Sequence, residues 1–266
     1  MKFLLTNDDG IYAKGLYALY EELSRIADCV VVAPETEQSA IGHAISISRP
    51  LMVRNARKNG DNFGYAVSGT PADCVKIGII ELSGENIDLV VSGINRGANV
   101  GINVIYSGTV SAATEGTIMG IPSMAISLDS HDKDADFSVA ARFAAKMARF
   151  ITGHKFFHGI PLNINVPALP EEQIKGVMVV KQGRGRLVES FERRLDPREN
   201  VYYWMAGETQ FCDLEEGQSD CTALKQGMIS VTPIYYDLTH HDVLPDLDKN
   251  LCAYLKNNHK GKRSKR

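Results

Sequence analysis

The segment Phe3-Leu4-Leu5-Thr6-Asn7-Asp8-Asp9-Gly10 decides the fold, because in it a short apolar run passes directly into two adjacent carboxylates. The run over residues 3–6 predicts a buried strand. Apolar residues then recur at helical spacing over 16–27, and a second apolar run over 29–33 ends at Pro34. Strand, helix and strand in this order form a βαβ unit, which places two parallel strands in one sheet.

The same alternation continues through the N-terminal half of the chain. Strands are predicted at 65–67, 89–91 and 124–128, and helices at 71–82, 107–119 and 136–151. The helix at 71–82 has the clearest start signal, because Thr70 can cap it, Pro71 suits its first position and Asp73 can complete a capping box. Continuous apolar strands separated by helices indicate a parallel sheet covered on both faces, so we predict a doubly wound, Rossmann-like α/β fold.

Beyond residue 161 the pattern changes to strands separated by turns. Strands are predicted at 162–166, 177–180, 201–205 and 229–234. We expect them to extend the sheet or to form a β-rich extension, not a second independent domain. The predicted organisation is one α/β domain over 1–255, made of a Rossmann-like core at 1–160 and a β-rich extension at 161–255. A basic tail over 256–266 is expected to be disordered.

Composition and charge exclude several classes of protein. The 266 residues include 29 Lys and Arg against 32 Asp and Glu, a formal net charge of −3, so a chain-wide basic surface for nucleic acid is excluded. Six of the basic residues fall in 256–266, which holds no acidic residue, so residues 1–255 carry 23 basic residues against 32 acidic ones. This acidic body suits recruitment of a divalent cation better than a stable nucleic-acid partner.

We expect a cytoplasmic protein that does not associate with membranes. The apolar run at the N-terminus ends at Asn7, too early for the core of a signal peptide, and no apolar stretch is long enough to span a membrane. Cysteines without a C-x-x-C pair indicate reduced thiols rather than a disulfide framework or a zinc site. The cysteines are Cys29, Cys74, Cys212, Cys221 and Cys252.

In open α/β sheets ligands bind beyond the carboxyl ends of the strands, and the loop after the first predicted strand carries Asp8 and Asp9. Adjacent carboxylates repel each other, and a divalent cation that prefers oxygen ligands is the usual means of keeping both ionised. The alternative is an Asx turn that Gly10 closes, because Asn-Asp-Asp-Gly is also favourable turn chemistry. The position at the first strand end favours the metal interpretation.

Two further segments are candidates for ligand binding. The loop over 92–101 carries Asn95 and Asn99 among glycines, which allow a ligand to approach the backbone, although such a loop can also be a plain surface connection. Tyr106-Ser107-Gly108-Thr109 then opens a helix, and the N–H groups and hydroxyls of a helix N-terminus bind phosphate. A cation site beside an anion site indicates phosphate-ester chemistry.

Taken together, these segments resemble the SurE family of metal-dependent nucleotidases, the survival proteins. The resemblance covers roughly residues 1–240 and rests on Ser39 and on several blocks in the same order. The blocks are Asn7-Asp8-Asp9-Gly10, Gly69-Thr70-Pro71-Ala72-Asp73-Cys74-Val75, Ser92-Gly93-Ile94-Asn95-x-Gly97-x-Asn99-x-Gly101, Tyr106-Ser107-Gly108-Thr109-Val110-Ser111-Ala112-Ala113-x-Glu115-Gly116 and Asn163-x-Asn165-Val166-Pro167. The segment Ser219-Asp220-Cys221-Thr222-Ala223 departs from the family pattern, because it lacks the second acidic residue of the family's acidic turn.

The resemblance implies phosphatase activity on nucleoside 5′- and 3′-monophosphates with one Mg²⁺ or Mn²⁺ per subunit. It also implies a homodimer or homotetramer built through C-terminal segments, so that the 161–255 extension would be the oligomerisation arm. By similarity, the cation ligands are Asp8, Asp9, Ser39 and Asn95. The residues implied to line the phosphate pocket are Asn99, Ser107, Gly108 and Thr109.

Elementary chemistry is consistent with these roles. Two carboxylates neutralise a divalent cation, while neutral ligands such as Ser39 and Asn95 still allow a phosphate dianion to approach it. The predicted catalytic residues are Asp8 and Asp9. Asp8 acts chiefly as a ligand of the cation, and either Asp9 or a cation-bound hydroxide takes the proton role. Donors at 107–109 would stabilise negative charge on the equatorial phosphate oxygens.

Two alternatives remain open at this point. One is a nucleotide-binding module that senses its ligand without hydrolysing it. The other is a phosphatase that forms an aspartyl-phosphate, although that class favours Asp-x-Asp after the first strand rather than adjacent acids.

Some polar residues have no assigned role. His43 is the best histidine candidate for orienting other site residues. His154 and His158 stand four apart but lack a third zinc ligand nearby, so we expect them at a helix end. The basic and aromatic segment over 184–204 is interpreted either as a nucleotide contact or as a hairpin at a subunit interface.

Overall fold

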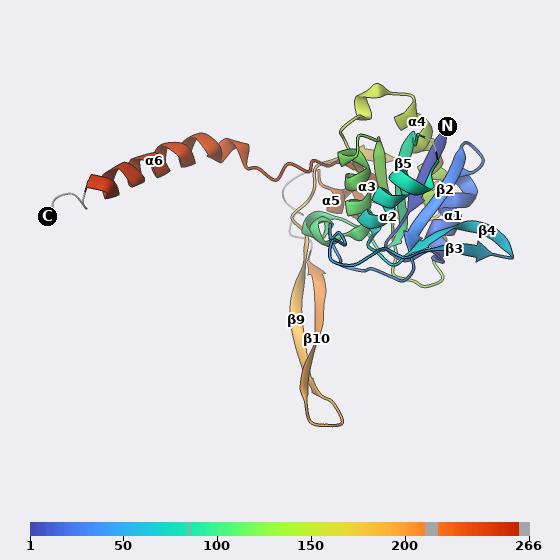
Figure 1. Cartoon of the computed structure of the whole chain (residues 1–266), viewed down its shortest axis with the longest axis horizontal. Helices are drawn as coiled ribbons and strands as arrows, with labels where there is room; N and C mark the ends of the chain where they lie inside the picture. Colours follow the sequence, from blue (N-terminus) through green and yellow to red (C-terminus); the bar gives the residue numbers. More distant parts are fainter. Residues whose placement is uncertain (85, 211–217, 261–266) are drawn as a thin grey trace. The chain divides into compact units, whose positions relative to one another are not determined.

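The computed structural model describes residues 1–84, 86–210 and 218–260 (Figure 1). Over these residues, nine strands form one sheet in the order β3-β4-β2-β1-β5-β6-β7-β11-β8. The strands are β1 (Lys2–Thr6), β2 (Asp28–Pro34), β3 (Val53–Lys58), β4 (Asp61–Val67), β5 (Leu89–Arg96), β6 (Ser123–Asp129), β7 (Leu162–Pro167), β8 (Val177–Val179) and β11 (Ile229–Pro233). From β4 to β7 all neighbours in the sheet are parallel, whereas β3 runs antiparallel to β4 and β11 antiparallel to β7.

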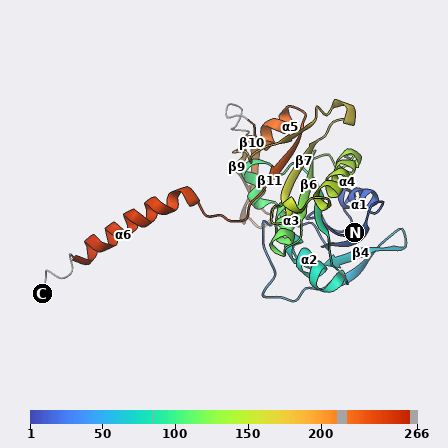
Figure 2. The same ribbon diagram turned by 90° about the horizontal axis from the view of Figure 1, so that it is seen from above.

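Helices cover both faces of this sheet (Figure 2). On one face α1 (Lys14–Leu23) packs beside α4 (Ser138–Thr152), and on the other α2 (Pro71–Ile77) packs beside α3 (Gly108–Ile118). Alternate residues of β1 serve the two faces: Leu5 is buried in the core with α1 and α4, and Leu4 in the core with α2. The predicted doubly wound, mostly parallel α/β fold is therefore confirmed.

The predicted start signal of α2 is present. Thr70 Oγ1 accepts the Asp73 N–H at 3.1 Å, and Asp73 Oδ2 accepts the Thr70 N–H at 2.9 Å, which completes the capping box. Beyond α2 the chain continues as a π-helical turn over Gly78–Leu82. A side chain at Gly78 would collide with the sheet, because a Cβ there would lie 2.9 Å from Leu4 Cδ1.

The C-terminal part of the α/β unit both extends the sheet and adds a separate hairpin. β7, β11 and β8 lie at one edge of the sheet, whereas β9 (Arg186–Leu195) pairs antiparallel with β10 (Val201–Gln210) in a sheet of its own. A short helix, α5 (Asp220–Lys225), precedes β11. The β-rich C-terminal extension is confirmed. Cys212, one of the cysteines predicted to be reduced, lies outside the described residues.

The chain divides into two compact units, Met1–Ile234 and Tyr235–Arg266. In the second unit α6 (Leu244–Lys260) repeats apolar residues every three or four positions. These residues are Leu244, Leu247, Leu251, Tyr254 and Leu255. Residues 256–260, which were predicted to belong to a disordered tail, are part of α6, and residues 261–266 lie outside the described residues. The predicted domain boundaries stay a prediction. None of the helices in the described ranges is long and apolar enough to cross a membrane.

Candidate metal and phosphate site

The ends of β1, β2 and β5 bring the predicted segments to one edge of the sheet. β1 lies between β2 and β5 and is parallel to both, with Thr6 beside Ser92 in the register. The loops that follow these strands therefore leave the sheet next to one another. A cleft of about 830 Å³ opens at this edge. The predicted residues that line it are Asp8, Asp9, Ser39, Asn95, Asn99 and Ser107.

Asp8 is nearly fully buried and contacts the start of α3. Only 6% of its surface is exposed, and its Oδ1 accepts a hydrogen bond from Thr109 Oγ1. Burial raises the pKa of Asp8, and the hydrogen bonds from Thr109 oppose this rise without cancelling it. The contact depends on Gly108, because a Cβ built there would lie 2.8 Å from the Cβ of Asp8. The absence of a side chain at position 108 thus lets the helix N-terminus reach the carboxylate.

Asp9 is less buried than Asp8 and lines the same cleft. Its Oδ2 accepts a hydrogen bond from the Arg96 N–H at 3.2 Å. Burial, and then the neighbouring charge of Asp8, raises the pKa of Asp9 to about 6. Two adjacent carboxylates whose ionised forms are both disfavoured are the electrostatic setting in which a bound cation is most favourable.

Ser39 is carried by the segment over residues 35–52, which joins β2 to β3 and is called the Ser39 loop below. Two backbone hydrogen bonds hold the loop on either side of Ser39. The Gln38 N–H donates to the Asp8 carbonyl oxygen at 2.7 Å, and the Gly42 N–H donates to the Tyr106 carbonyl oxygen at 3.0 Å. The loop is thereby attached both to the carboxylate segment and to the residue before the Ser107 helix start.

The two asparagines of the segment predicted as a glycine-rich loop are also held by hydrogen bonds, and the first of them, Asn95, lies at the end of β5 rather than in a loop. Asn95 Nδ2 donates to the Gly97 carbonyl oxygen at 2.7 Å, which orients the Asn95 amide. The Asn99 N–H donates to Asn165 Oδ1 at 2.7 Å, and the Asn99 carbonyl oxygen accepts from Asn163 Nδ2 at 2.7 Å. The Asn163-x-Asn165 block on β7 therefore fixes the backbone of Asn99 beside the cleft.

The N-terminus of α3 contributes to the wall of the cleft through Ser107. Ser107 is the N-cap, and its Oγ accepts the Val110 N–H at 3.1 Å. The first N–H groups of an α-helix have no partner within the helix, and the helix dipole favours an anion there. Ser107 lines the cleft, whereas Gly108 and Thr109 contact Asp8 and do not belong to its lining as far as the chain is described.

The donor chemistry fits a hard divalent cation. In the described part of the chain, no group of three His, Cys, Asp or Glu side chains could hold a metal ion, so a cation at Asp8 and Asp9 would complete its coordination with neutral oxygens and water. Ser39 and Asn95 supply such oxygens. Asn7 Oδ1 is buried and has no hydrogen-bond partner among the described residues, which leaves one more polar oxygen next to Asp8. An all-oxygen set suits Mg²⁺ or Mn²⁺ better than Zn²⁺, which prefers nitrogen and sulfur.

Comparison with known proteins agrees with the sequence blocks. The family model described as "Survival protein SurE" matches residues 3–189. The chain belongs to the SurE family. A 5′-nucleotidase SurE of Syntrophus aciditrophicus is 65% identical over 247 residues, which cover 93% of this chain and 92% of the relative. One of Syntrophobacter fumaroxidans is 52% identical over 249 residues, covering 94% and 99%. The crystal structure of SurE from Aquifex aeolicus has a TM-score of 0.80 at 37% identity, covering 94% of this chain and 99% of that chain.

The SurE resemblance of the sequence is confirmed by these matches, while the binding roles of the individual residues stay a prediction. The fold places all eight predicted residues at one edge of the sheet, six of them lining the cleft and two against Asp8. Their nearness in space is what a shared cation and phosphate site requires.

Several residues of this SurE cleft were not predicted from the sequence: Glu37, Arg96, Asn103, Tyr106, His131, Glu189 and Met205. Glu37 Oε1 accepts from Ser39 Oγ at 2.5 Å. His131 follows β6 and packs on Gly97, where a Cβ would lie 2.7 Å from the His131 Cε1. Both residues follow the carboxyl end of a strand, so the rule that ligands bind beyond these ends, called the strand-end rule below, would have identified them. Glu189 and Met205 come from the β9–β10 hairpin, whose segment over 184–204 was interpreted from its basic and aromatic residues as one possible nucleotide contact, but neither of these two side chains was singled out.

Two other histidines, His154 and His43, lie in different settings. His154 follows the end of α4, and its Nδ1 lies 2.6 Å from the Phe150 carbonyl oxygen, which agrees with the expected helix end. His43 lies on the Ser39 loop with its Nε2 2.7 Å from Glu115 Oε2.

Proposed function

We propose that this SurE-family chain is a metal-dependent 5′-nucleotidase that hydrolyses nucleoside monophosphates to nucleoside and phosphate, and that it also accepts 3′-monophosphates. The observation that supports the proposal is the contact of buried Asp8 with the first turn of α3, because a cation held by Asp8 would then lie beside an anion bound at the helix N-terminus. The relatives named 5′-nucleotidase support the substrate class.

Asp8, Asp9, Ser39 and Asn95 would hold one Mg²⁺ or Mn²⁺ per subunit. When bound, the cation would polarise the phosphoryl group and lower the pKa of a coordinated water. The two carboxylates would balance its charge, and the neutral oxygens of Ser39 and Asn95 would leave the cleft able to accept a phosphate dianion. The hydrogen bond from Arg96 N–H orients Asp9 for this role.

The phosphate group would lie against the N-terminus of α3. The Ser107 hydroxyl and the N–H groups of Gly108 and Thr109 would stabilise negative charge on its equatorial oxygens as the bond to the nucleoside breaks. Asn99 would bind a phosphate oxygen from the other side, with its backbone held by β7. Donors fixed before the substrate arrives need no reorganisation during the reaction.

Asp9 is the carboxylate better placed to take the proton of the attacking water, whereas Asp8 acts chiefly as a ligand. Asp9 is the less buried of the two and lines the cleft, so its carboxylate is the more accessible to water. Asp8 is already occupied by the Thr109 hydroxyl. If Asp8→Asn and Asp9→Asn each kept full metal-dependent activity, this assignment would be wrong.

The deciding experiment measures phosphate release from a panel of 5′- and 3′-mononucleotides with Mg²⁺, with Mn²⁺ and with a chelator. We expect release that depends on the cation and is abolished by the chelator. Binding of nucleotides without release under any condition would instead indicate a sensing module. Isolation of a phosphorylated aspartate after acid quenching would indicate the aspartyl-phosphate class.

A cytoplasmic location belongs to the same proposal, as does a homodimer or homotetramer built through the 161–255 extension. The support for the oligomer is the apolar surface of the β9–β10 hairpin, which exceeds what single exposed apolar residues would explain. The exposed apolar side chains there are Phe191, Leu195, Val201, Tyr202, Tyr203, Trp204 and Met205. Light scattering coupled to size-exclusion chromatography would give the subunit number, and a monomer at micromolar concentration would contradict the proposal.

A further inference from the structure

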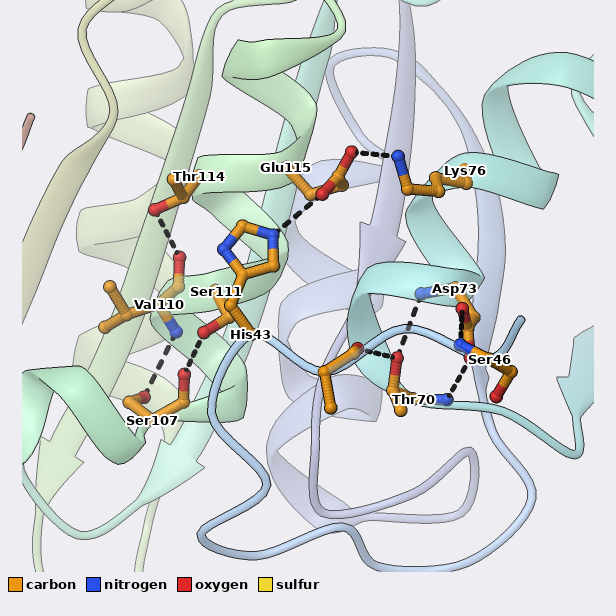
Figure 3. A network of polar contacts seen from close by, with 11 residues as sticks. His43, Ser46, Thr70, Asp73, Lys76, Ser107, Val110, Ser111, Thr114 and Glu115 are labelled. Carbon is orange, nitrogen blue, oxygen red and sulfur yellow. Dashed lines mark hydrogen bonds and ion pairs between the residues drawn. The ribbon is translucent and has the colours of Figure 1, made fainter. Parts of the chain in front are cut away.

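Beyond the two backbone hydrogen bonds beside Ser39, the Ser39 loop is also attached to α2 (Figure 3). Thr70 Oγ1 donates to the Ala44 carbonyl oxygen at 2.7 Å, and Asp73 Oδ1 accepts the Ser46 N–H at 2.9 Å. Both partners belong to the capping box of α2. The part of the loop after residue 43 is therefore fixed to α2 without any contribution from the cleft.

Between Ser39 and these α2 contacts, the loop reaches α3 through the side chain of His43. Its Nε2 lies 2.7 Å from Oε2 of Glu115, on the same helix whose first turn contacts Asp8. Figure 3 shows the imidazole pointing from the loop toward α3, with the Glu115 carboxylate between His43 and Lys76. His43 thus joins the loop that carries a predicted cation ligand to the helix that forms the phosphate wall.

Because the Glu115 carboxylate is buried, the loss of its contact with His43 would be unfavourable. Its side chain is only 5% exposed, and its Oε1 forms an ion pair with Lys76 Nζ at 2.5 Å. Burial alone raises the pKa of Glu115, but the contacts with His43 and Lys76 outweigh burial and lower the pKa. Lys76 already balances the charge, so loss of His43 would leave Oε2 buried without its donor, which is unfavourable.

We propose that His43 is a positioning residue, which by its contact with Glu115 holds the Ser39 loop against α3 and thereby sets the affinity of the cleft for its divalent cation. His43 touches neither the cation nor the phosphate in this role. The inference rests on the proposed function, because it takes Ser39 to be a cation ligand. Its reach is local, since the α2 contacts of Ala44 and Ser46 do not depend on the imidazole.

The test measures the dissociation constant for Mn²⁺ alone, with free Mn²⁺ quantified by electron paramagnetic resonance. We expect His43→Ala to weaken Mn²⁺ binding about tenfold, because the loop loses a hydrogen bond to a charged group. His43→Gln, whose amide can still donate to Glu115, should stay within about threefold of the unsubstituted protein. His154→Ala is the matched control, because it removes a histidine at the end of α4, and it should leave Mn²⁺ binding unchanged.

Ser39→Ala distinguishes positioning from a general loosening of the structure. If His43 acts through Ser39, adding His43→Ala to Ser39→Ala should weaken Mn²⁺ binding by less than about twofold more. Three results would each overturn the inference. His43→Ala could still weaken Mn²⁺ binding tenfold in the Ser39→Ala background, or it could leave Mn²⁺ binding unchanged on its own. The third is that His43→Gln weakens Mn²⁺ binding as much as His43→Ala does.

Thermal unfolding confirms that each variant is folded at the temperature of the measurement. Should His43→Ala not fold, His43→Asn replaces it, because the shorter amide retains a polar group but does not span the distance to Glu115. Failure of the proposed function would look different. In that case the unsubstituted protein itself would neither bind Mn²⁺ nor release phosphate from any mononucleotide.

Discussion

The cleft at the strand ends and the β9–β10 hairpin differ in where their side chains find partners. In the cleft, Asp8 is 6% exposed and its carboxylate is bonded to Thr109 of the same chain. On the hairpin, Tyr203 and Trp204 are 59% and 58% exposed. The cleft is therefore explained by the packing of one chain, whereas the proposed subunit interface would account for the apolar surface of the hairpin. Substitutions should affect chemistry in the first region and assembly in the second.

The largest effect is expected from Asp8→Asn. The variant removes one of two charges that would bind the cation, so turnover of a 5′-mononucleotide should fall about 1000-fold at fixed Mn²⁺. The same change removes a buried charge, so the metal-free variant should unfold about 2–4 °C higher than the unsubstituted protein. Phosphate release measures the turnover, and calorimetry measures the unfolding temperature. Lower stability together with lost activity would instead indicate a structural role for Asp8.

Gly108→Ala tests whether the cleft depends on the close approach of α3. The added Cβ would lie 2.8 Å from the Cβ of Asp8, so the helix must move away and activity should fall about 100-fold. Gly116→Ala is the matched control on the same helix, because its Cβ would lie 2.5 Å from Ser123 Oγ, away from the cleft. Both variants should lose about 1–3 kcal/mol of unfolding free energy. Equal losses of activity in the two would show that the Asp8 contact has no special role.

Trp204→Glu tests the hairpin side of the comparison. A carboxylate in an apolar interface is unfavourable, so the assembly should dissociate at concentrations at least about tenfold higher than for the unsubstituted protein. Ile80→Glu is the control, because Ile80 is 65% exposed but lies on the π-helical turn after α2. Light scattering over a dilution series measures the mass. If Trp204→Glu and Ile80→Glu assemble equally well, the hairpin is not the interface.

Local patterns in the sequence predicted the part of the fold that local forces determine. The capping box at Thr70 and Asp73 and the apolar run of β1 occur where predicted, whereas β5 continues to Arg96 and so includes the first half of the segment predicted as a loop over 92–101. The strand-end rule brought Asp8 and Asn95 to one edge of the sheet, and the family match confirms the resemblance that these blocks suggested.

β3 and β9 owe their structure to neighbouring strands rather than to local pattern, whereas α6 repeats apolar residues at helical spacing and could have been predicted. β3 is largely polar and pairs at the sheet edge with β4, and β9 carries charged residues that only its pairing with β10 places in a strand. The same limit applies to the site, because Glu189 reaches the cleft from β9. A sequence pattern shows neither a long-range strand pairing nor the side chain that such a pairing carries into a distant cleft.

The smallest effect concerns Glu115, whose ionised form is stabilised by His43 and Lys76 although burial opposes it. Because the folded-state pKa lies below the ordinary value of 4.5, the ionised carboxylate stabilises the fold above that pH, and the contribution is lost as the pH falls through the folded-state pKa. Glu115→Gln should therefore be less stable than the unsubstituted protein at pH 7, on the order of 1 kcal/mol, and the difference should shrink in acid. Urea unfolding at pH 7, 4 and 3 measures this.

Glu171→Gln is the control for that titration, because the pKa of Glu171 is also lowered, by Arg142, but its partners are half exposed to solvent. A solvent-screened pair contributes little, so this variant should follow the unsubstituted protein at every pH. If Glu171→Gln and Glu115→Gln show the same pH dependence, burial on α3 does not strengthen the His43 contact, and the Ser39 loop is held by its backbone hydrogen bonds and by α2 alone.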